Sequence, residues 1–312
     1  MSGLAPRGTA LAALAVIALA VAGCGSSNDN NTTSSSSSST SSTSSTSSST
    51  APAKDAQVAA LVPAAIKSKG TLTVAADASY APNEFIGSDG KTVEGMDADL
   101  AKALASVMGL KAKVVNQTFD SIIPGLASNK YDLGMSSFTD TKEREKTVDF
   151  VTYFSAGTSF YAKAQGAPNV NGLADLCGLK VAVEKGTTQA DDSNAQSKKC
   201  TAAGKKPVSV SVFPDQNGAN LAISSGRAQV GMADSPVADY QVKKSNGQFK
   251  LLGQPYGTAP YGIAMNKKSG LSKPVLAGIK ALIADGTYKT ILTKWGIESG
   301  AISNPVINGA TS

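Results

Sequence analysis

The chain has 312 residues with 29 basic and 23 acidic side chains, and it contains no histidine. Without imidazole, histidine-based triads, histidine metal ligands and imidazole general bases are excluded, and three cysteines alone do not make a four-ligand zinc site. The lysines are scattered and the aromatic side chains do not interleave with them. The net charge of +6 therefore indicates a solvated surface and no nucleic-acid site.

Residues 1–23 have the pattern of a signal peptide. Arg7 supplies a positive charge, and the apolar run from Leu11 to Val21 is too short to span a bilayer. The run ends in Val-Ala-Gly followed by Cys24, which resembles a bacterial lipobox. We therefore expect residues 1–23 to be cleaved and Cys24 to carry a lipid anchor; an ordinary signal peptide with a chance cysteine is the alternative.

Residues 24–54 are predicted to be a disordered linker between the anchor and a folded body. Residues 32–50 are only serine and threonine, so this stretch has no apolar side chains to offset the entropy lost on ordering. A coil of this length reaches roughly 30 Å, which lets a tethered domain search the space near the membrane. The sequence leaves open whether the hydroxyl groups are glycosylated.

Cys177 and Cys200 remain as an even pair once Cys24 is assigned to the lipobox. In an oxidising compartment such a pair favours a disulfide, and we predict one between them. It would close a loop of roughly 24 residues and stabilise the fold by about 3 kcal/mol in the chain-entropy model.

From Thr71 onward, short apolar strands alternate with helices. This alternation predicts parallel α/β sheets, and two such series with a return segment predict two lobes. The first series has expected strands at 72–75, 113–115 and 133–135 and helices at 97–108 and 119–128. The second has strands at 181–183, 208–213 and 230–232, a helix after Thr188, and helices at 216–225 and 235–244. The return segment has a strand at 261–266 and helices at 273–285 and 288–295.

Polar side chains gather where four of these strands end, which is where open α/β sheets place ligands. An arginine offers a fork of donors to a carboxylate, an aspartate accepts from an ammonium group, and aromatic faces cover an apolar stem. Each residue also has a simpler interpretation: Thr187, Ser235 and Asp234 could be helix caps, and Arg144 could pair with Glu143 or Asp149. Together the set suits a zwitterion. Its members are Asp77, Tyr80, Phe119, Ser136, Ser137, Thr139, Arg144, Thr188, Gln189 and Asp234.

Residues 70–296 resemble the family of extracellular solute-binding proteins that serve polar amino-acid ABC importers. The resemblance rests on Gly-Thr-Leu-Thr-Val-Ala-Ala-Asp at 70–77, Phe-Asp-Ser-Ile-Ile-Pro-Gly-Leu at 119–126, Gly-Thr-Thr-Gln at 186–189, and Asp-Ser-Pro at 234–236. Its most specific stretch runs from Ser136 to Phe150 and places Arg144 eight residues after Ser136.

This resemblance implies an α/β fold of the type II periplasmic-binding-protein kind, with two lobes joined by two hinge crossovers. Lobe 1 would comprise 55–160 and 256–300, lobe 2 would comprise 161–255, and 301–312 would be a C-terminal tail. The chain would be a monomeric, extracytoplasmic substrate-binding lipoprotein that works with an ABC permease and an ATPase, takes no cofactor and is no enzyme.

The resemblance also implies roles for the site residues. Arg144, helped by Thr139 and Thr188, would hold a carboxylate. Asp234 would take an ammonium group with the backbone around Ser137. The remaining expectations are that Tyr80 and Phe119 sandwich the side chain, that Asp77 lies near its far end, and that Gln189 lines the wall of lobe 2.

The ligand stays open because Asn83, Glu84 and Phe138 depart from the pattern that is common in the family. Two alternatives also stay open. One is a prephenate or arogenate dehydratase-like enzyme with Glu84 or Glu184 as its acid, and the other is a sensing lipoprotein without a transport partner. A dinucleotide site is excluded because no G-x-G-x-x-G follows the first strand.

Overall fold

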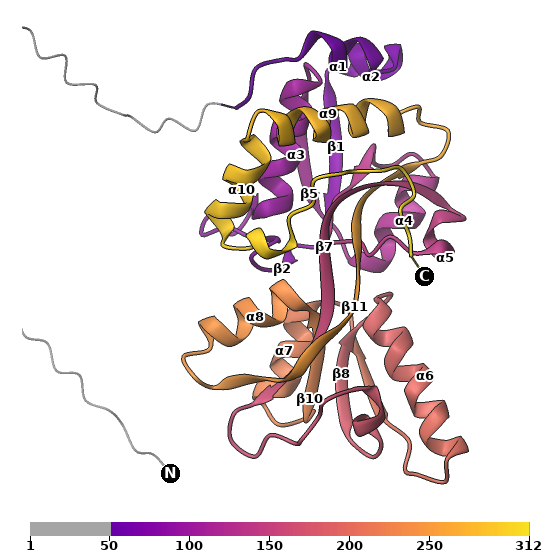
Figure 1. The fold of residues 1–312 in the computed structure, drawn as a ribbon, viewed down its shortest axis with the longest axis vertical. Helices are drawn as coiled ribbons and strands as arrows, with labels where there is room; N and C mark the ends of the chain where they lie inside the picture. The colour runs from indigo at the N-terminus through magenta and orange to yellow at the C-terminus, as the bar shows by residue number, and fades with distance from the viewer. Residues whose placement is uncertain (1–50, 312) are drawn as a thin grey trace, which may run out of the picture. The chain divides into compact units, whose positions relative to one another are not determined.

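The computed structural model describes residues 51–311. The predicted signal peptide, Cys24 and the linker as far as residue 50 lie outside these residues. Within 51–311, no helix combines the length and the apolar character that a membrane span requires. The described residues form two α/β lobes that are connected by two long strands (Figure 1).

The first lobe is built on three parallel strands, with β1 paired to β5 on one side and to β6 on the other. Helix α3 buries Leu100, Leu104 and Val107 against this sheet, and the core also includes residues of α9 and α10 from the C-terminal part of the chain. The elements are β1 (Thr71–Ala76), α3 (Met96–Val107), β5 (Lys111–Asn116), α4 (Phe119–Ala127), β6 (Leu133–Gly134), α5 (Lys142–Glu145), α9 (Ser272–Ala284) and α10 (Thr287–Trp295).

Several short elements of this lobe have no counterpart among the predicted ones. Two helices, α1 (Ala56–Leu61) and α2 (Ala64–Lys69), precede β1, and a small antiparallel sheet joins β2 (Ser79–Tyr80), β3 (Glu84–Ile86) and β4 (Val93–Glu94). They are two to six residues long, which is too short to show a clear apolar period.

The second lobe repeats the parallel pattern with β8 between β9 and β10. The structure contains the predicted disulfide between Cys177 and Cys200, whose Cα atoms lie 5.6 Å apart, and it ties α6 to the segment before β8. The elements are a 3₁₀ turn (Leu173–Leu176), β8 (Lys180–Glu184), α6 (Thr188–Ala202), β9 (Ser209–Phe213), α7 (Gln216–Ser224), β10 (Val230–Asp234) and α8 (Ser235–Lys244).

Two long strands, β7 (Val148–Lys163) and β11 (Phe249–Asn266), pass through both lobes and pair antiparallel to each other. They complete one sheet in the order β5-β1-β6-β11-β7-β10-β8-β9. The expectation of parallel sheets is therefore wrong for these two strands. The predicted strand at 261–266 is only the last part of β11, whose earlier part contains Gly253, Pro255 and Gly257 and so has the composition of a turn.

The β7–β11 ladder is irregular where the chain passes from one lobe to the other. Its register shifts between Leu252 and Tyr256 and again between Tyr256 and Ala259. Gly253 and Gly257 have φ angles of 60° and 63°, a backbone conformation that favours glycine. Part of this section connects the two lobes, and we expect the hinge there.

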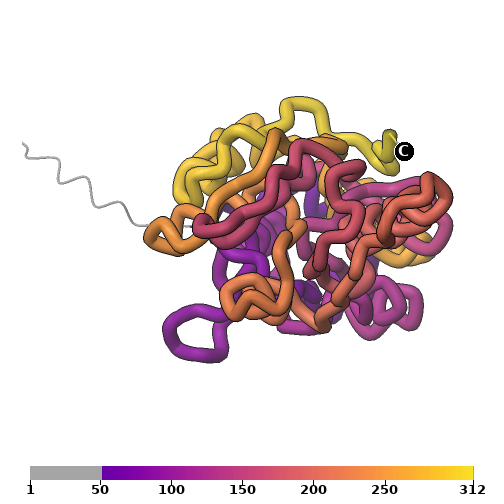
Figure 2. Tube along the Cα trace, turned by 90° about the horizontal axis from the view of Figure 1, so that it is seen from below, coloured from indigo at the N-terminus to yellow at the C-terminus, as the bar shows by residue number. Residues whose placement is uncertain are grey.

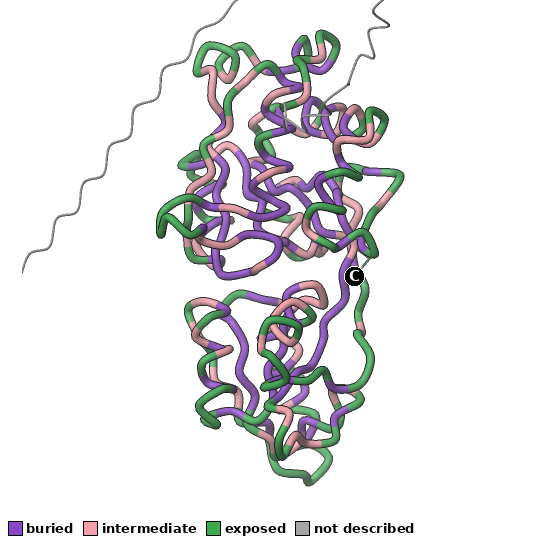
Figure 3. Tube along the Cα trace, turned by 90° about the vertical axis from the view of Figure 1, so that its left-hand side faces the viewer, coloured by how far each residue is buried: buried purple, intermediate pink, exposed green. Residues whose placement is uncertain are grey.

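Each lobe has its own interior, and in Figure 3 buried segments run through both of them while exposed loops lie at the periphery. The C-terminal segment, yellow in Figure 2, adds a further strand-like contact to β7. There Val306 O accepts a hydrogen bond from Thr152 N, and Asn308 N donates to Phe150 O. The residue boundaries predicted for the lobes and the tail stay a prediction.

Candidate functional site

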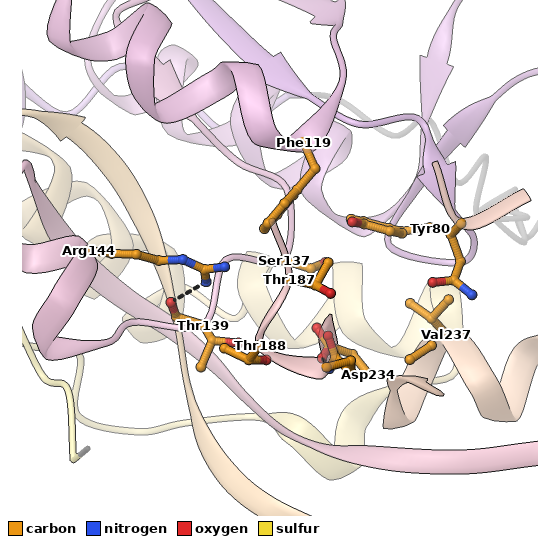
Figure 4. Close-up of a pocket in the computed structure, with 12 residues that line it drawn as sticks. Tyr80, Phe119, Ser137, Thr139, Arg144, Thr187, Thr188, Asp234 and Val237 are labelled. Atoms are coloured by element: carbon orange, nitrogen blue, oxygen red, sulfur yellow. Dashed lines mark hydrogen bonds between the residues drawn. The ribbon is translucent and has the colours of Figure 1, made fainter. Parts of the chain in front are cut away.

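A cavity of about 350 Å³, including its mouth toward solvent, lies where the carboxyl ends of the strands of both lobes meet. Figure 4 shows the side chains that surround it. Most of the predicted ligand residues line it: Tyr80, Phe119, Ser137, Thr139, Arg144, Thr188, Gln189 and Asp234. The lining also contains Thr187, Gln216, Ala233 and Val237, which the sequence did not single out as ligand residues.

Arg144 lies on the short helix α5 and reaches across from lobe 1 to lobe 2. Its guanidinium donates to Thr139 O at 2.8 Å and to Gly186 O at 3.0 Å, and it lies 5.2 Å from the centre of the Phe119 ring. The alternative pairing with Glu143 or Asp149 does not occur. Among residues 51–311 no carboxylate lies within ion-pair distance of Arg144, so its remaining donors are available to an anion in the cavity.

Asp234 occupies the N-cap position of α8, yet its side chain makes no capping hydrogen bond. Its carboxylate instead accepts from Gln189 Nε2 and from the Tyr261 hydroxyl, both at 2.6 Å. Burial raises the pKa of Asp234, while these two hydrogen bonds and the Arg144 charge act in the opposite direction. The capping interpretation of Asp234 is therefore wrong, and its carboxylate is held at the cavity wall.

For Thr187, in contrast, the capping interpretation is right. Its hydroxyl accepts from Ala190 N at 3.2 Å and starts α6. Its neighbours Thr188 and Gln189 also face the cavity. The amide of Gln189 donates to Asp234 and to Thr158. Gln189 thus helps to fix the position of the Asp234 carboxylate at the cavity wall.

Two aromatic rings form one wall of the cavity, and a third lies behind them. Tyr80 and Phe119 meet edge to face, with ring centres 5.9 Å apart and an angle of 65° between the planes. Phe138 is stacked behind Phe119 with ring centres 4.4 Å apart, and it is fully buried. Phe138 therefore stiffens the wall and does not line the cavity.

Asp77 and Ser136 lie behind the cavity wall and are not among its lining residues. The Asp77 carboxylate accepts from the Ser79 hydroxyl at 2.6 Å and from Phe119 N at 3.0 Å. Ser136 Oγ accepts from Asp77 N at 2.8 Å and donates to Glu84 at 3.0 Å. Burial raises the pKa of Asp77, and the hydrogen bonds from Ser79 and Phe119 partly offset this effect.

Glu184, at the end of β8, faces Asp77 from the other lobe. It is 1% exposed, and neither carboxyl oxygen has a hydrogen-bond partner among the described residues. Burial, reinforced by the nearby Asp77 and Asp215 carboxyl groups, raises the pKa of Glu184 to about 9. The Tyr80 hydroxyl also points at Glu184, although no hydrogen bond of normal geometry joins them. The sequence signal for Glu184 is a charged residue directly after the buried strand at 181–183.

The two lobes touch each other directly around the cavity. Lys185 pairs with Asp120 at 2.8 Å, and Gln216 N donates to Ser79 Oγ at 3.1 Å. Together with the bond from Arg144 to Gly186 O, these contacts join the strand ends of lobe 1 to those of lobe 2. The structure therefore represents a closed arrangement of the lobes.

Comparison with known proteins gives consistent results. The family model for bacterial extracellular solute-binding proteins, family 3, matches residues 72–298. The arginine-binding protein ArgT of Corynebacterium glutamicum is 35% identical over 253 residues, which cover 81% of this chain and 83% of that protein.

Two solved structures share the fold. An ancestral arginine-binding protein bound to arginine has a TM-score of 0.66 and 36% identity, and the match covers 72% of this chain and 98% of that one. AncCDT-1, an ancestral amino acid-binding protein described as a precursor of cyclohexadienyl dehydratase, has a TM-score of 0.64 and 36% identity over 74% of this chain and 97% of that one. With its type II two-lobed fold and the cavity between the lobes, this chain belongs to family 3 of the bacterial extracellular solute-binding proteins and has their substrate-binding role.

Proposed function

We propose that this protein captures an amino acid with a cationic side chain, of the arginine type, and presents it to the permease and ATPase of an ABC importer. The observation that carries the choice of ligand is Glu184, a buried carboxyl group without a partner that faces Asp77. Burying two carboxyl groups against each other is unfavourable unless a proton or a cation lies between them.

The α-amino and α-carboxylate groups of the ligand have matching partners at the opposite end of the cavity. Arg144 retains free donors in the fork geometry that a carboxylate accepts. Asp234 is fixed by Gln189 and Tyr261, and as an anion it accepts from an ammonium group. Phe119 and Tyr80 lie between these groups and the acidic end, where the apolar stem of a side chain would pass.

The relatives support the same ligand class, since the names of ArgT and of the ancestral structure both refer to arginine. We further propose that the mature chain is a monomer held on the outer face of the membrane by a lipid on Cys24. The lipobox-like Val-Ala-Gly-Cys sequence and the serine- and threonine-rich stretch after it support this proposal.

We also propose that the protein binds its ligand without catalysing a reaction. Glu84, one of the two candidate acids, is fully buried, accepts from Ser136 and Ser137, and is absent from the cavity lining. Glu184 is also absent from the cavity lining in this closed arrangement, and in the proposed role it pairs with the cationic end of the ligand side chain and is not available as an acid. Incubation with prephenate and with arogenate should therefore yield no dehydration product, and turnover of either compound would contradict the proposal.

Calorimetric titration with arginine, lysine, glutamine and glutamate tests the choice of ligand. Arginine should bind most tightly and glutamate least. In a melting experiment, a ligand at 100 times its Kd stabilises the protein by about 2.7 kcal/mol, which is an easily measured shift. Failure of every amino acid to bind would refute the proposed function, whereas tighter binding of glutamate than of arginine would refute only the cationic ligand.

A further inference from the structure

A second pair of buried carboxyl groups lies behind the cavity, in lobe 1. Glu84 on β3 is fully buried and Asp97 in the first turn of α3 is 1% exposed, and neither lines the cavity. Gly95 brings the two elements together: its φ is 123°, and a Cβ atom there would collide with the carbonyl oxygen of Asn83. The close approach of β3 and α3 therefore requires glycine at this position.

Both carboxyl groups hold Ser137, which does line the cavity. Asp97 Oδ2 accepts from Ser137 N at 2.9 Å, and Glu84 Oε2 accepts from the Ser137 hydroxyl at 3.3 Å. The same hydroxyl accepts from Asn83 Nδ2 at 2.8 Å, and Ser136 donates to Glu84 Oε1 at 3.0 Å. Ser137 has a φ of 51°, a backbone conformation that is unfavourable for residues other than glycine. It therefore depends on these bonds to keep its conformation.

The pair has no basic partner among the described residues. The groups that face it are the hydroxyls of Tyr80, Tyr153 and Tyr261 and the Asp77 carboxyl group, none of which is a cation near neutral pH. The two carboxyl groups bond to the N–H and the hydroxyl of the same residue, Ser137, so they lie near each other and out of water. Two carboxylates in such a place are not both ionised, so the pair retains a proton. Burial and the neighbouring Asp97 raise the pKa of Glu84 well above its ordinary value, and burial raises the pKa of Asp97 to about 6.

We propose that Glu84 and Asp97 are positioning residues of the ligand cavity: joined by one proton, they hold Ser137 in the conformation that the bound amino acid requires. In this arrangement the neutral carboxyl group of Glu84 donates a hydrogen bond to the Asp97 carboxylate. The Asp97 carboxylate in turn accepts a hydrogen bond from Ser137 N. The inference rests on the proposed function insofar as it assigns a ligand to the cavity, whereas the shared proton itself can be tested without any ligand.

The first test compares Glu84→Gln with Glu84→Ala by calorimetric titration with arginine at neutral pH. Glutamine can donate to Asp97 through its amide nitrogen and accept from Ser136 through its oxygen, and it loses only the long 3.3 Å bond from the Ser137 hydroxyl, so E84Q should bind within about threefold of wild type. Alanine leaves Asp97 and both serines without their partner, so E84A should lose about tenfold or more in affinity. Glu143→Gln, which removes an exposed carboxyl group of α5, is the matched control and should bind as wild type does.

Two results would overturn the proposal. One is an E84A variant that binds as tightly as wild type, and the other is an E84Q variant that loses as much affinity as E84A. If wild type binds none of the amino acids, the proposed function fails, and the second test still decides whether the pair shares a proton.

The second test follows ligand-free stability against pH, and it needs only the conservative variant. The ordinary pKa of Glu84 is 4.5, so above this pH its carboxyl group is ionised in the unfolded protein, whereas in the folded protein it keeps its proton. Stability of wild type therefore falls as pH rises from there to the higher folded pKa. Above about pH 6, where Asp97 ionises, the unfolding constant of wild type relative to E84Q should rise with pH by up to tenfold per pH unit for as long as Glu84 keeps its proton. Parallel profiles for the two proteins would refute the shared proton.

Discussion

The two ends of the ligand cavity are built differently. At one end, Arg144 donates to two backbone carbonyl groups and Asp234 accepts from Gln189 and Tyr261. Arg144 keeps further donors for a ligand, and Asp234 keeps further acceptor capacity. At the other end, Glu184 and the Tyr80 hydroxyl are buried and have no hydrogen-bond partner among the described residues. The side chains of the first end line the cavity and are fixed by protein groups, whereas Glu184 at the second end lies outside the lining and has no protein partner among the described residues.

Under the proposed function, this difference would separate recognition of any amino acid from selection among side chains. Every α-amino acid carries the carboxylate and the ammonium group that Arg144 and Asp234 suit, so this end cannot distinguish one side chain from another. Glu184 and Asp77 come from β8 and from the end of β1, and neither residue contacts Arg144 or Asp234. If the proposed function is right, we expect substitutions at the acidic end to change the ligand while the α-amino end stays intact.

The largest effect is expected from Arg144→Ala. Removing one partner of a desolvated charge pair costs about 2–5 kcal/mol, so affinity for every amino acid should fall at least about 30-fold. The ligand-free melting temperature should change little, because the Arg144 side chain forms no ion pair within residues 51–311 and loses only two hydrogen bonds to backbone carbonyl groups and its contact with Phe119 and Phe138. Calorimetric titration with arginine and with glutamine checks the affinities.

The matched control for this change is Arg227→Ala, which removes the other arginine of the described residues, an exposed side chain stacked on Phe213. Its ligand affinities should equal those of wild type. Retained binding in the Arg144 variant would show that the ligand carboxylate is held elsewhere and that the comparison of the two ends is wrong.

An intermediate and selective effect is expected from Glu184→Gln. Without the carboxylate, arginine should bind about tenfold more weakly, because a hydrogen bond to a charged group contributes about 1.5–3 kcal/mol. The uncharged side chain of the ligand glutamine forms no ion pair with Glu184, so its affinity should stay within about threefold of that for wild type. Titration of both ligands against wild type, E184Q and the surface control E143Q measures the ratio, and an equal loss for both ligands would count against selection by Glu184.

The same substitution has an effect on stability with a defined sign. The pKa of Glu184 is raised from 4.5 to about 9 in the folded protein, so between these values the folded state binds more protons than the unfolded state. Stability of ligand-free wild type should therefore fall as pH rises from about 5 to 9. Replacing Glu184 by glutamine should flatten this part of the profile, as thermal unfolding at several pH values can show; an unchanged slope would place the raised pKa in doubt.

The smallest effect is expected from Lys185→Ala, which removes a pair that lies outside both ends of the cavity. Lys185 bonds to Asp120 across the lobes at 2.8 Å, and its side chain is 66% exposed. An exposed pair contributes about 0.2–1 kcal/mol, so affinity should fall at most about fivefold and equally for arginine and glutamine. The loss of affinity should disappear in high salt, and the double variant K185D with D120K, which exchanges the two charges, should restore affinity. A loss that is larger for arginine than for glutamine, or the reverse, would mean that Lys185 reaches the acidic end.

Much of the fold follows from local pattern. The helices α3, α4, α7 and α8 and the strands β1, β8 and β10 lie within a few residues of their predicted places, because each has an apolar period and a recognisable end. β7 and the first half of β11 could not be predicted in this way, since the partner of each strand lies about 100 residues away and glycine and proline interrupt the pattern. Antiparallel pairing of these two strands is a property of the tertiary structure.

Part of the site could also be predicted from local sequence pattern. Residues at strand ends, such as Arg144 and Asp234, converge because parallel strands end at one edge of the sheet. Asp77 and Ser136 also lie at strand ends, but their hydrogen bonds go to other protein groups behind the wall. Glu184 was considered only as a catalytic acid, since its position opposite Asp77 depends on how the lobes meet.

The irregular section of the β7–β11 ladder has a mechanical consequence. A two-stranded ribbon with full register resists bending along its length, whereas the section between Leu252 and Ala259 lacks regular pairing. A further shift follows between Tyr261 and Gly262, so we expect the ribbon to bend within this part of its length, with each lobe turning as a unit. A turn at this place would leave the separate core of each lobe intact and would part only the buried side chains of the two lobes that meet around the cavity.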